Sequence, residues 1–291
     1  MTLILTCLTD DAVYQVSDRR LTSFTPPHTP IDDESNKAVF VNGRVVFAYT
    51  GISQVEGQRT DIWLAHAIAS RPSHDMNEIA NHVKNKATAA FQHMKFASLY
   101  KRHAFQGAGW FLNPSGTFLR PGILTIHNAL DPASRDWLTS AKHEFELLSE
   151  FYTLRRNQFI LSGVGLRPTP AERGGVHQLL RKCVHRGAGR ATAIIHALAL
   201  SMRWLSRRYE PNSPIGRSLM AVCLPKVSAE LYVKTGKFMA FASAPEKDSV
   251  TFLDLPEFRR PVSYGPNTVI GGAVITNFEC RPIENDGNAA S

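Results

Sequence analysis

Residues 3–17, LILTCLTDDAVYQVS, predict that the chain opens with a β-hairpin. The apolar runs LILTCL and AVYQVS flank Thr9-Asp10-Asp11, whose composition is typical of a turn. A second hairpin is expected in KAVFVNGRVVFAYT, residues 37–50, because Asn42-Gly43 can supply the positive φ angles of a type I′ turn. These four runs are expected to form a small antiparallel sheet before any helix appears.

The remaining sequence alternates between helix and strand patterns. Helices are expected from residue 60, from 75, from 169 and over about 190–208, where caps and apolar spacing agree. Strand patterns follow the last helix in SLMAVCL, AELYV, KFMAFA and TFLDL. Because this order lacks a βαβ alternation, we expect an α+β fold: a four-layer αββα sandwich of two antiparallel sheets, with additional C-terminal strands.

Length and composition favour one large domain. A chain of 291 residues with 43% apolar and 20% charged side chains can bury a substantial core. We expect a single domain over residues 1–283 and a disordered polar tail, ENDGNAAS, over 284–291. No basic stretch precedes the first apolar run, so neither a signal peptide nor a membrane span is expected, and the predicted location is the cytoplasm.

Metal, cofactor and nucleic-acid sites are not expected. The four cysteines lie far apart without a CxxC pair, and the 11 histidines form no HExxH motif, so we predict neither a metal site nor a cofactor. The net charge of +8 includes a basic block over residues 181–208. Aromatic residues are not interleaved with this block, which favours a solvated helix surface over a nucleic-acid partner.

Five candidate functional residues lie in the first fifth of the chain, at the ends of expected strands: Thr2, Asp18, Arg20, Lys37 and Gly51. Removal of Met1 would give Thr2 both a hydroxyl and a free α-amine. An α-amine has a pKa of about 7.7 to 8.0, so it can accept the hydroxyl proton near neutral pH. Thr2 would then supply both nucleophile and general base.

Three further residues have roles available beside this nucleophile. Lys37 is the candidate cation that favours an alkoxide on Thr2, and Asp18 would hold Lys37 charged and aligned. The backbone N–H of Gly51 would face the oxyanion, because glycine allows close approach of a substrate carbonyl.

These motifs resemble the proteasome β-subunit family of N-terminal-nucleophile hydrolases and its smaller bacterial homologues. The runs that carry the resemblance are TLILTCLTDDAVYQVSDRR, NKAVFVNGRVVFAYTG and LSGVG. The spacing of sixteen from Thr2 to Asp18, the Asp-x-Arg motif with Arg20, and the spacing of fourteen from Lys37 to Gly51 match the family. The resemblance implies that Ser162, in LSGVG, assists the α-amine.

Three departures accompany the resemblance, one of which is that the extra strands expected after Val227 make the chain larger than a minimal β-subunit. The stretch between Asp18 and Lys37 is about three residues longer than is usual in the family. The family's Asp-x-x-Ser-Gly motif corresponds best to residues 212–216, NSPIG, which lack the aspartate and the serine.

The resemblance implies a threonine-type peptidase that hydrolyses amide bonds in peptides or unfolded protein, within a ring-like or spiral homo-oligomer. Two alternatives remain open: a non-proteolytic amidase acting on a small molecule, and a catalytically silent scaffold or binding subunit. For single residues, Asp18 and Arg20 could form a strand-end ion pair, Lys37 a solvated strand start, Gly51 a turn and Ser162 a polar turn position. The sequence names neither the physiological substrate nor an unfolding partner.

Overall fold

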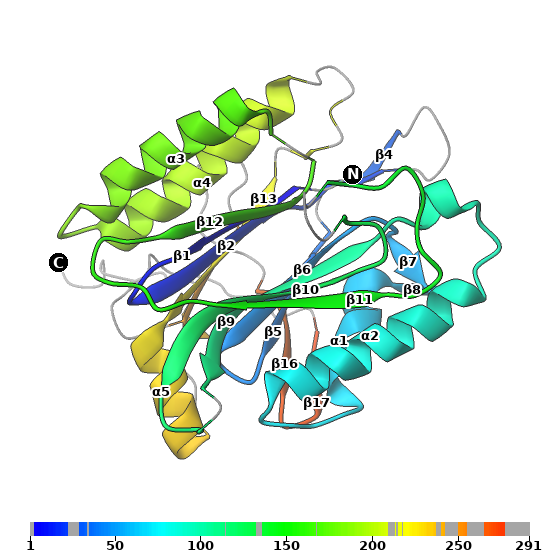
Figure 1. Cartoon of the computed structure of the whole chain (residues 1–291), viewed down its shortest axis with the longest axis horizontal. Helices are drawn as coiled ribbons and strands as arrows, with labels where there is room; N and C mark the ends of the chain where they lie inside the picture. The colour runs from blue at the N-terminus through cyan, green and yellow to red at the C-terminus, as the bar shows by residue number, and fades with distance from the viewer. Residues whose placement is uncertain are drawn as a thin grey trace, which may run out of the picture.

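Two large β-sheets form the centre of the protein (Figure 1). The computed structural model describes residues 3–22, 29–33, 35–113, 115–131, 136–166, 168–208, 213, 215–216, 218–236, 240–241, 250–254 and 265–276. The first sheet has six strands: β12 (Ile160–Gly165), β1 (Leu3–Leu8), β2 (Ala12–Asp18), β13 (Leu219–Pro225), β15 (Val250–Asp254) and β14 (Ala240–Phe241), in that spatial order.

The second sheet has seven strands: β11 (Glu146–Phe151), β10 (Leu119–His127), β9 (Ala104–Leu112), β6 (Val45–Thr50), β5 (Ala38–Val41), β16 (Asn267–Ile270) and β17 (Ala273–Ile275), again in spatial order. Two short sheets pair β3 (Leu21–Thr22) with β4 (Pro30–Asp32), and β7 (Gln54–Val55) with β8 (Gln58–Arg59). The helices are α1 (Thr60–Ala69), α2 (Met76–Gln92), η1 (Ser98–Lys101), α3 (Pro170–Val184), α4 (Arg190–Arg207) and α5 (Lys226–Thr235).

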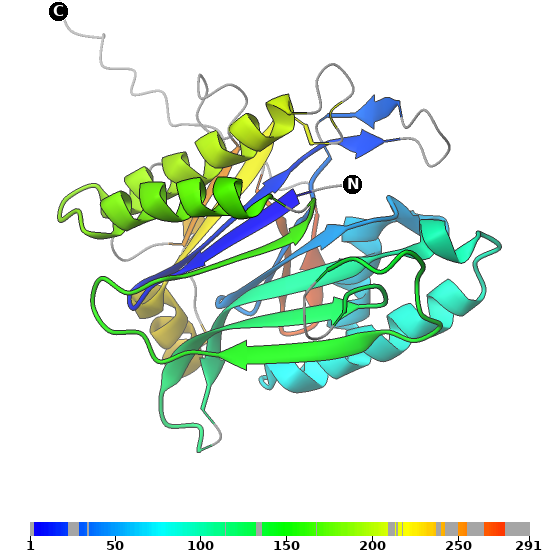
Figure 2. The same cartoon turned by 45° about the horizontal axis from the view of Figure 1, so that its top comes forward.

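Helices cover the outer faces of the two sheets. Helices α3 and α4 pack on the six-stranded sheet, whereas α1 and α2 pack on the seven-stranded sheet (Figures 1 and 2). A third apolar cluster, including Leu8, Phe40 and Trp110, lies between the sheets. The indole Nε1 of Trp110 in β9 donates to the Leu224 carbonyl of β13 at 2.9 Å and so joins the sheets directly. The expected α+β architecture, with two sheets flanked by helices, is confirmed.

Both expected hairpins are present, but they belong to different sheets. The β5–β6 turn has Asn42 at φ 47° and Gly43 at φ 66°, as its sequence predicts. The expectation that the four runs form one small sheet is wrong, because β1–β2 joins β12 and β13 whereas β5–β6 joins β9 and β16. Turn chemistry determines which strands form a hairpin but not the sheet that the hairpin enters.

The prediction that both sheets are antiparallel is also wrong. The chain returns to both sheets after α5, and there β5 pairs with β16, and β14 with β15, in parallel. Parallel neighbours need no turn between them, so no local sequence signal announces them.

The run AELYV, expected as a strand, lies within helix α5. The buried side chains of α5, Ser228, Ala229 and Tyr232, recur at helical spacing, and Gly236 ends the helix with φ 68°. Five residues are too few to separate a strand from a helix by periodicity. None of the described helices is both long and apolar enough to cross a membrane. The tail predicted over 284–291 lies outside the described residues.

Candidate active site

A buried carboxylate, Asp18, forms the centre of the site. Asp18 ends β2 and its side chain is fully buried. Its Oδ2 accepts from the Leu3 backbone N–H at 2.8 Å, and its Oδ1 accepts from the Arg20 N–H at 3.0 Å and from the Gly216 N–H at 3.4 Å. An ionised carboxylate is only an acceptor, so it can accept all three of these hydrogen bonds.

Lys37 brings a buried cation to the same carboxylate. Its Nζ lies 3.1 Å from Oδ1 of Asp18, with both side chains fully buried, and it also donates to the Arg20 carbonyl. Burial lowers the pKa of Lys37, while Asp18 opposes that shift. The alternative of a solvated Lys37 is therefore wrong. Lys37 precedes β5 of the second sheet, so this pair connects the ends of the two sheets.

Arg20 organises the loops around this pair. Its guanidinium forms two hydrogen bonds with the Asp33 carboxylate, at 2.6 and 2.9 Å, and donates to the Ser213 carbonyl at 2.9 Å. The hydrogen bond to Asp33 raises the pKa of Arg20. The side chain of Arg20 thus bonds Asp33, and only its backbone N–H bonds Asp18, which is not the Asp18–Arg20 pair considered as an alternative.

The segment after α4 packs against the same cluster. A Cβ on Gly216 would lie 2.7 Å from the Arg20 Cβ, so only glycine fits there without a shift. The NSPIG run therefore contacts Asp18 through the Gly216 N–H and Arg20 through the Ser213 carbonyl, although Asn212 and Pro214 lie outside the described residues.

Gly51 lies at the same end of the second sheet as Lys37. It follows β6, whose antiparallel partner β5 begins directly after Lys37. Its φ of 120° lies in a region that favours glycine, and an added Cβ would lie 2.6 Å from both the Arg102 carbonyl oxygen and Nδ1 of His103. Gly51 therefore requires glycine for its backbone conformation and for its packing.

Sequence reasoning missed His103, which supports the Gly51 loop. Its Nδ1 accepts from the Ile52 backbone N–H at 3.0 Å, and its ring stacks on Tyr49 with centroids 5.8 Å apart. His103 is fully buried, and burial lowers its pKa to about 3. The neutral ring thus acts as an acceptor at Nδ1. A lone histidine with no motif around it gave no sequence signal for this role.

Ser162 is not brought to the Asp18–Lys37 cluster. It pairs with Thr6, whereas Leu3, which bonds Asp18, pairs with Gly165. Its hydroxyl accepts from Nε2 of Gln106 at 3.2 Å, in the space between the sheets. Ser162 lies beside a separate cavity instead.

Thr2 lies outside the described residues, and its neighbour Leu3 begins β1. Among the described residues, no group of three or more His, Cys, Asp or Glu side chains is arranged to hold a metal ion.

Comparisons with known proteins reveal similarity in fold. No protein-family model and no curated protein matches the sequence. The structure is similar to Anbu (ancestral beta-subunit) from Yersinia bercovieri, with a TM-score of 0.47 and 11% identity over 77% of this chain and 81% of that chain. Anbu from Hyphomicrobium sp. strain MC1 gives 0.44 and 12% over 77% and 82%, and eukaryotic HslV from Trypanosoma brucei gives 0.39 and 13% over 77% and 99%. These are proteasome β-subunit-like N-terminal-nucleophile hydrolases.

Proposed function

We propose that the protein is an N-terminal threonine hydrolase that cleaves amide bonds in peptides, with Thr2 as its nucleophile. The proposal rests mainly on the Asp18 carboxylate, which accepts both the Leu3 N–H and Lys37 Nζ. Leu3 is the covalent neighbour of Thr2, and Leu3 contacts Asp18 at this end of β1. The proposal therefore takes the Thr2 hydroxyl to act at the end of the strand where the buried Asp18–Lys37 pair lies.

The proposed reaction uses each group once. The α-amine of Thr2 takes the hydroxyl proton as Oγ1 attacks the substrate carbonyl, and it then gives this proton to the departing amine as the C–N bond breaks. The Gly51 N–H stabilises the oxyanion. The positive φ of Gly51 and the lack of room for a Cβ, which require glycine at this position, support the proposed role. Water then hydrolyses the resulting ester and restores Thr2.

Lys37 and Asp18 act on the nucleophile through charge. A buried ammonium favours the alkoxide that develops on Thr2 and disfavours protonation of the neighbouring α-amine. Burial lowers the pKa of Lys37, and the Asp18 carboxylate opposes this shift and so favours the charged ammonium. The donors that fix Asp18 come from four segments of the chain, which makes it a positioning residue.

Replacement of the nucleophile tests the proposal. Thr2→Ala is expected to abolish hydrolysis of a fluorogenic peptide library, whereas Thr2→Ser should retain part of the rate because it keeps a hydroxyl and an α-amine. Intact mass measurement should show loss of Met1 in both the original chain and these variants. A mature protein that retains Met1, or a Thr2→Ala variant of undiminished rate, would contradict the mechanism.

The same assay separates the two remaining functions. An amidase acting on a small molecule would keep the Thr2 dependence but turn over no member of the peptide library. A silent scaffold would show neither turnover nor covalent labelling of Thr2 by an electrophile such as an epoxyketone.

A further inference from the structure

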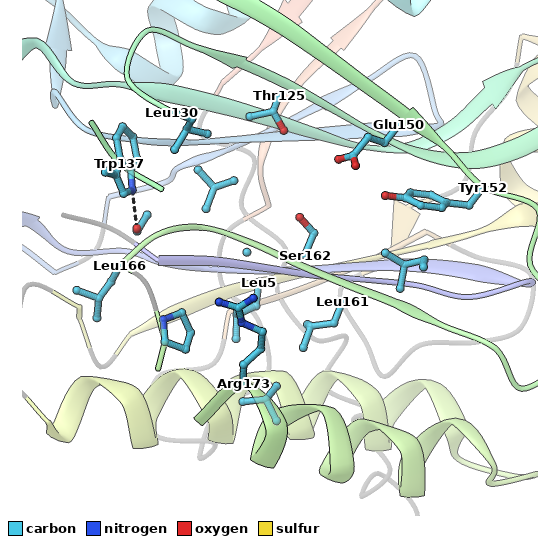
Figure 3. Close-up of a pocket in the computed structure, with 16 residues that line it drawn as sticks. Leu5, Thr125, Leu130, Trp137, Glu150, Tyr152, Leu161, Ser162, Leu166 and Arg173 are labelled. Atoms are coloured by element: carbon cyan, nitrogen blue, oxygen red, sulfur yellow. Dashed lines mark hydrogen bonds between the residues drawn. The ribbon is translucent and has the colours of Figure 1, made fainter. Parts of the chain in front are cut away.

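A cavity of about 290 Å³ lies at the free edge of β12 (Figure 3), and neither Asp18 nor Lys37 is among the residues that line it. Among the described strands, β12 is hydrogen-bonded only to β1. The free edge of a sheet presents unpaired backbone groups to any extended chain that reaches it. Which backbone groups of β12 are available to such a chain depends on the direction in which each residue points its N–H and C=O groups.

Two hydrogen bonds determine the direction of these groups. The Leu3 N–H points to Asp18, on the β2 side of β1, so the alternate residues Ile4 and Thr6 point towards β12. Their antiparallel partners, Val164 and Ser162, consequently bond β1.

The remaining residues of β12, namely Leu161, Gly163 and Gly165, must face outward. The indole of Trp137 supports this assignment, because its Nε1 donates to the Gly165 carbonyl at 2.6 Å from beyond the edge. No described residue hydrogen-bonds the outward backbone groups of Leu161 and Gly163. These groups form a two-residue template for an added strand.

The side chains around this template differ between its two faces. Leu161 packs into the apolar cluster under α3 and α4, so Gly163, two residues further on, faces the same way but adds no side chain of its own. The cavity extends there between Leu5 and Val176. A residue paired with Gly163 would place its side chain in this apolar space.

The opposite face is polar. Ser162 points into the space faced by Thr125 (Figure 3), and both residues line the cavity. Because the Ser162 hydroxyl accepts from Gln106, its own proton remains to be donated to a ligand. In an added strand, the two neighbours of the residue paired with Gly163 would project their side chains towards this polar face, where small polar side chains fit.

We propose that the β12 edge binds an extended polypeptide segment by strand addition, with a large apolar side chain opposite Gly163 and small polar side chains on both sides of it. Main-chain hydrogen bonds to Leu161 and Gly163 would give affinity, and the space left by Gly163 would give selectivity. The site needs neither Thr2 nor turnover, so it stands independently of the proposed hydrolysis.

Fluorescence polarisation of a labelled peptide, acetyl-Thr-Ser-Phe-Ser-Thr-amide, tests the proposal on the full chain carrying Thr2→Ala. Replacement of Phe by Ala in the peptide should weaken binding by about tenfold or more, because a buried aromatic side chain is lost. Gly163→Val should remove this preference by filling the space beside Leu5; its Cβ would lie 3.3 Å from Leu5 Cδ2 and 3.4 Å from the Ile4 carbonyl oxygen, so these neighbours must shift by a few tenths of an ångström. Gly174→Ala, on the open surface of α3, is the matched control and should bind normally.

N-methylation of the peptide separates strand addition from other modes of binding. In an added strand, alternate N–H groups face β12, so either the Phe N–H or the N–H groups of the flanking serines bond the edge. Methylation of the backbone nitrogen should therefore abolish binding at one of these two positions and be tolerated at the other. The sensitive position also reveals whether the added strand is parallel or antiparallel. Equal tolerance or equal loss at both positions would refute strand addition.

Three other outcomes would also overturn the proposal. One is unchanged peptide binding by Gly163→Val, which would place the peptide elsewhere. Another is absence of binding together with a Gly163-dependent dimer, which would make a second copy of the chain the occupant. The third outcome concerns Gly163→Ala, which replaces Gly163→Val if the latter fails to fold. The proposal is overturned if this variant keeps its thermal unfolding midpoint and loses binding to the Phe peptide, and if peptides with a smaller apolar side chain do not bind it either.

Discussion

Two charged side chains of the site, Asp18 and Lys37, are buried. Asp18 and Lys37 are a fully buried ion pair that connects the ends of two sheets, whereas Lys142 and Glu146, 2.6 Å apart, form a half-exposed pair. Removing one partner of a buried pair leaves an uncompensated charge, but an exposed pair contributes little to stability. The two pairs therefore provide a matched comparison within one chain.

Lys37→Met is expected to lower the free energy of unfolding by about 3 to 5 kcal/mol, because Asp18 loses its buried cation. The double variant Lys37→Met/Asp18→Asn should lose less than the sum of the single changes, since neither charge then remains buried alone. Urea unfolding at pH 7 measures each value. Lys142→Met, the control, should change the free energy of unfolding by at most about 1 kcal/mol. Additive effects at Asp18 and Lys37 would argue against their pairing.

His103 makes stability depend on pH. Its pKa is about 3 in the folded protein, because burial disfavours the charged ring, against an ordinary value of about 6.5. The unfolded chain therefore binds more protons between these values, so the contribution is complete above pH 6.5 and is lost as pH falls towards 3. The loss amounts to about 1.4 kcal/mol per pH unit.

His103→Asn should remove this dependence. The Asn Oδ1 can accept from the Ile52 N–H as Nδ1 does, but it does not titrate. Between pH 7 and pH 5 the original chain should lose about 2 kcal/mol more in free energy of unfolding than this variant. His185→Asn, at an exposed position, should keep the original slope. An unchanged slope in His103→Asn would show that His103 does not titrate as described.

At the scale of elements, local chemistry was informative wherever an element is specified by its own residues. Helix α3 starts where its sequence predicts, with residue 169 as its cap, and Thr169 and Glu172 exchange hydrogen bonds there as a capping box. Helix α2 instead uses Asp75 as its cap while Glu78 accepts from Ser73, outside the helix. Both alternatives satisfy the free N–H groups of the first turn. The choice between them depends on neighbours that the short motif does not include.

At the scale of the whole molecule, contacts between the sheets hold the site together, because Asp18 and Lys37 come from different sheets. Trp110 is fully buried between these sheets and bonds Leu224 across them. Its removal should therefore affect the site as well as stability.

Trp110→Ala is expected to lower the free energy of unfolding by about 3 to 5 kcal/mol, through lost packing and a cavity. Trp110→Phe keeps much of the ring but leaves the Leu224 carbonyl without its donor, so we expect a loss of about 1 to 3 kcal/mol. Denaturant unfolding measures both values, and amide exchange at Leu3 reports on the Asp18 contact. If exchange at Leu3 is unaffected by Trp110→Ala, the site does not depend on the contacts between the sheets.

The sequence alone determined the hairpins, the main helix starts and the short list of chemically important positions. Asn42-Gly43, the Asp-x-Arg motif and the spacing from Lys37 to Gly51 are local signals, and a local signal can be read without the fold. It correctly assigned the α+β class and singled out Asp18 and Lys37, which the structure brings within 3.1 Å.

Only the tertiary structure decided which elements meet. In the folded protein the two hairpins lie in different sheets, and His103 packs against Gly51 and bonds the Ile52 N–H. Ser162 lies beside the cavity at the edge of β12 and not beside Asp18. Each of these facts depends on contacts between residues far apart in the chain. Burial and register, not residue type, determine those contacts, and a one-residue difference in register turns a side chain to the other face of its sheet.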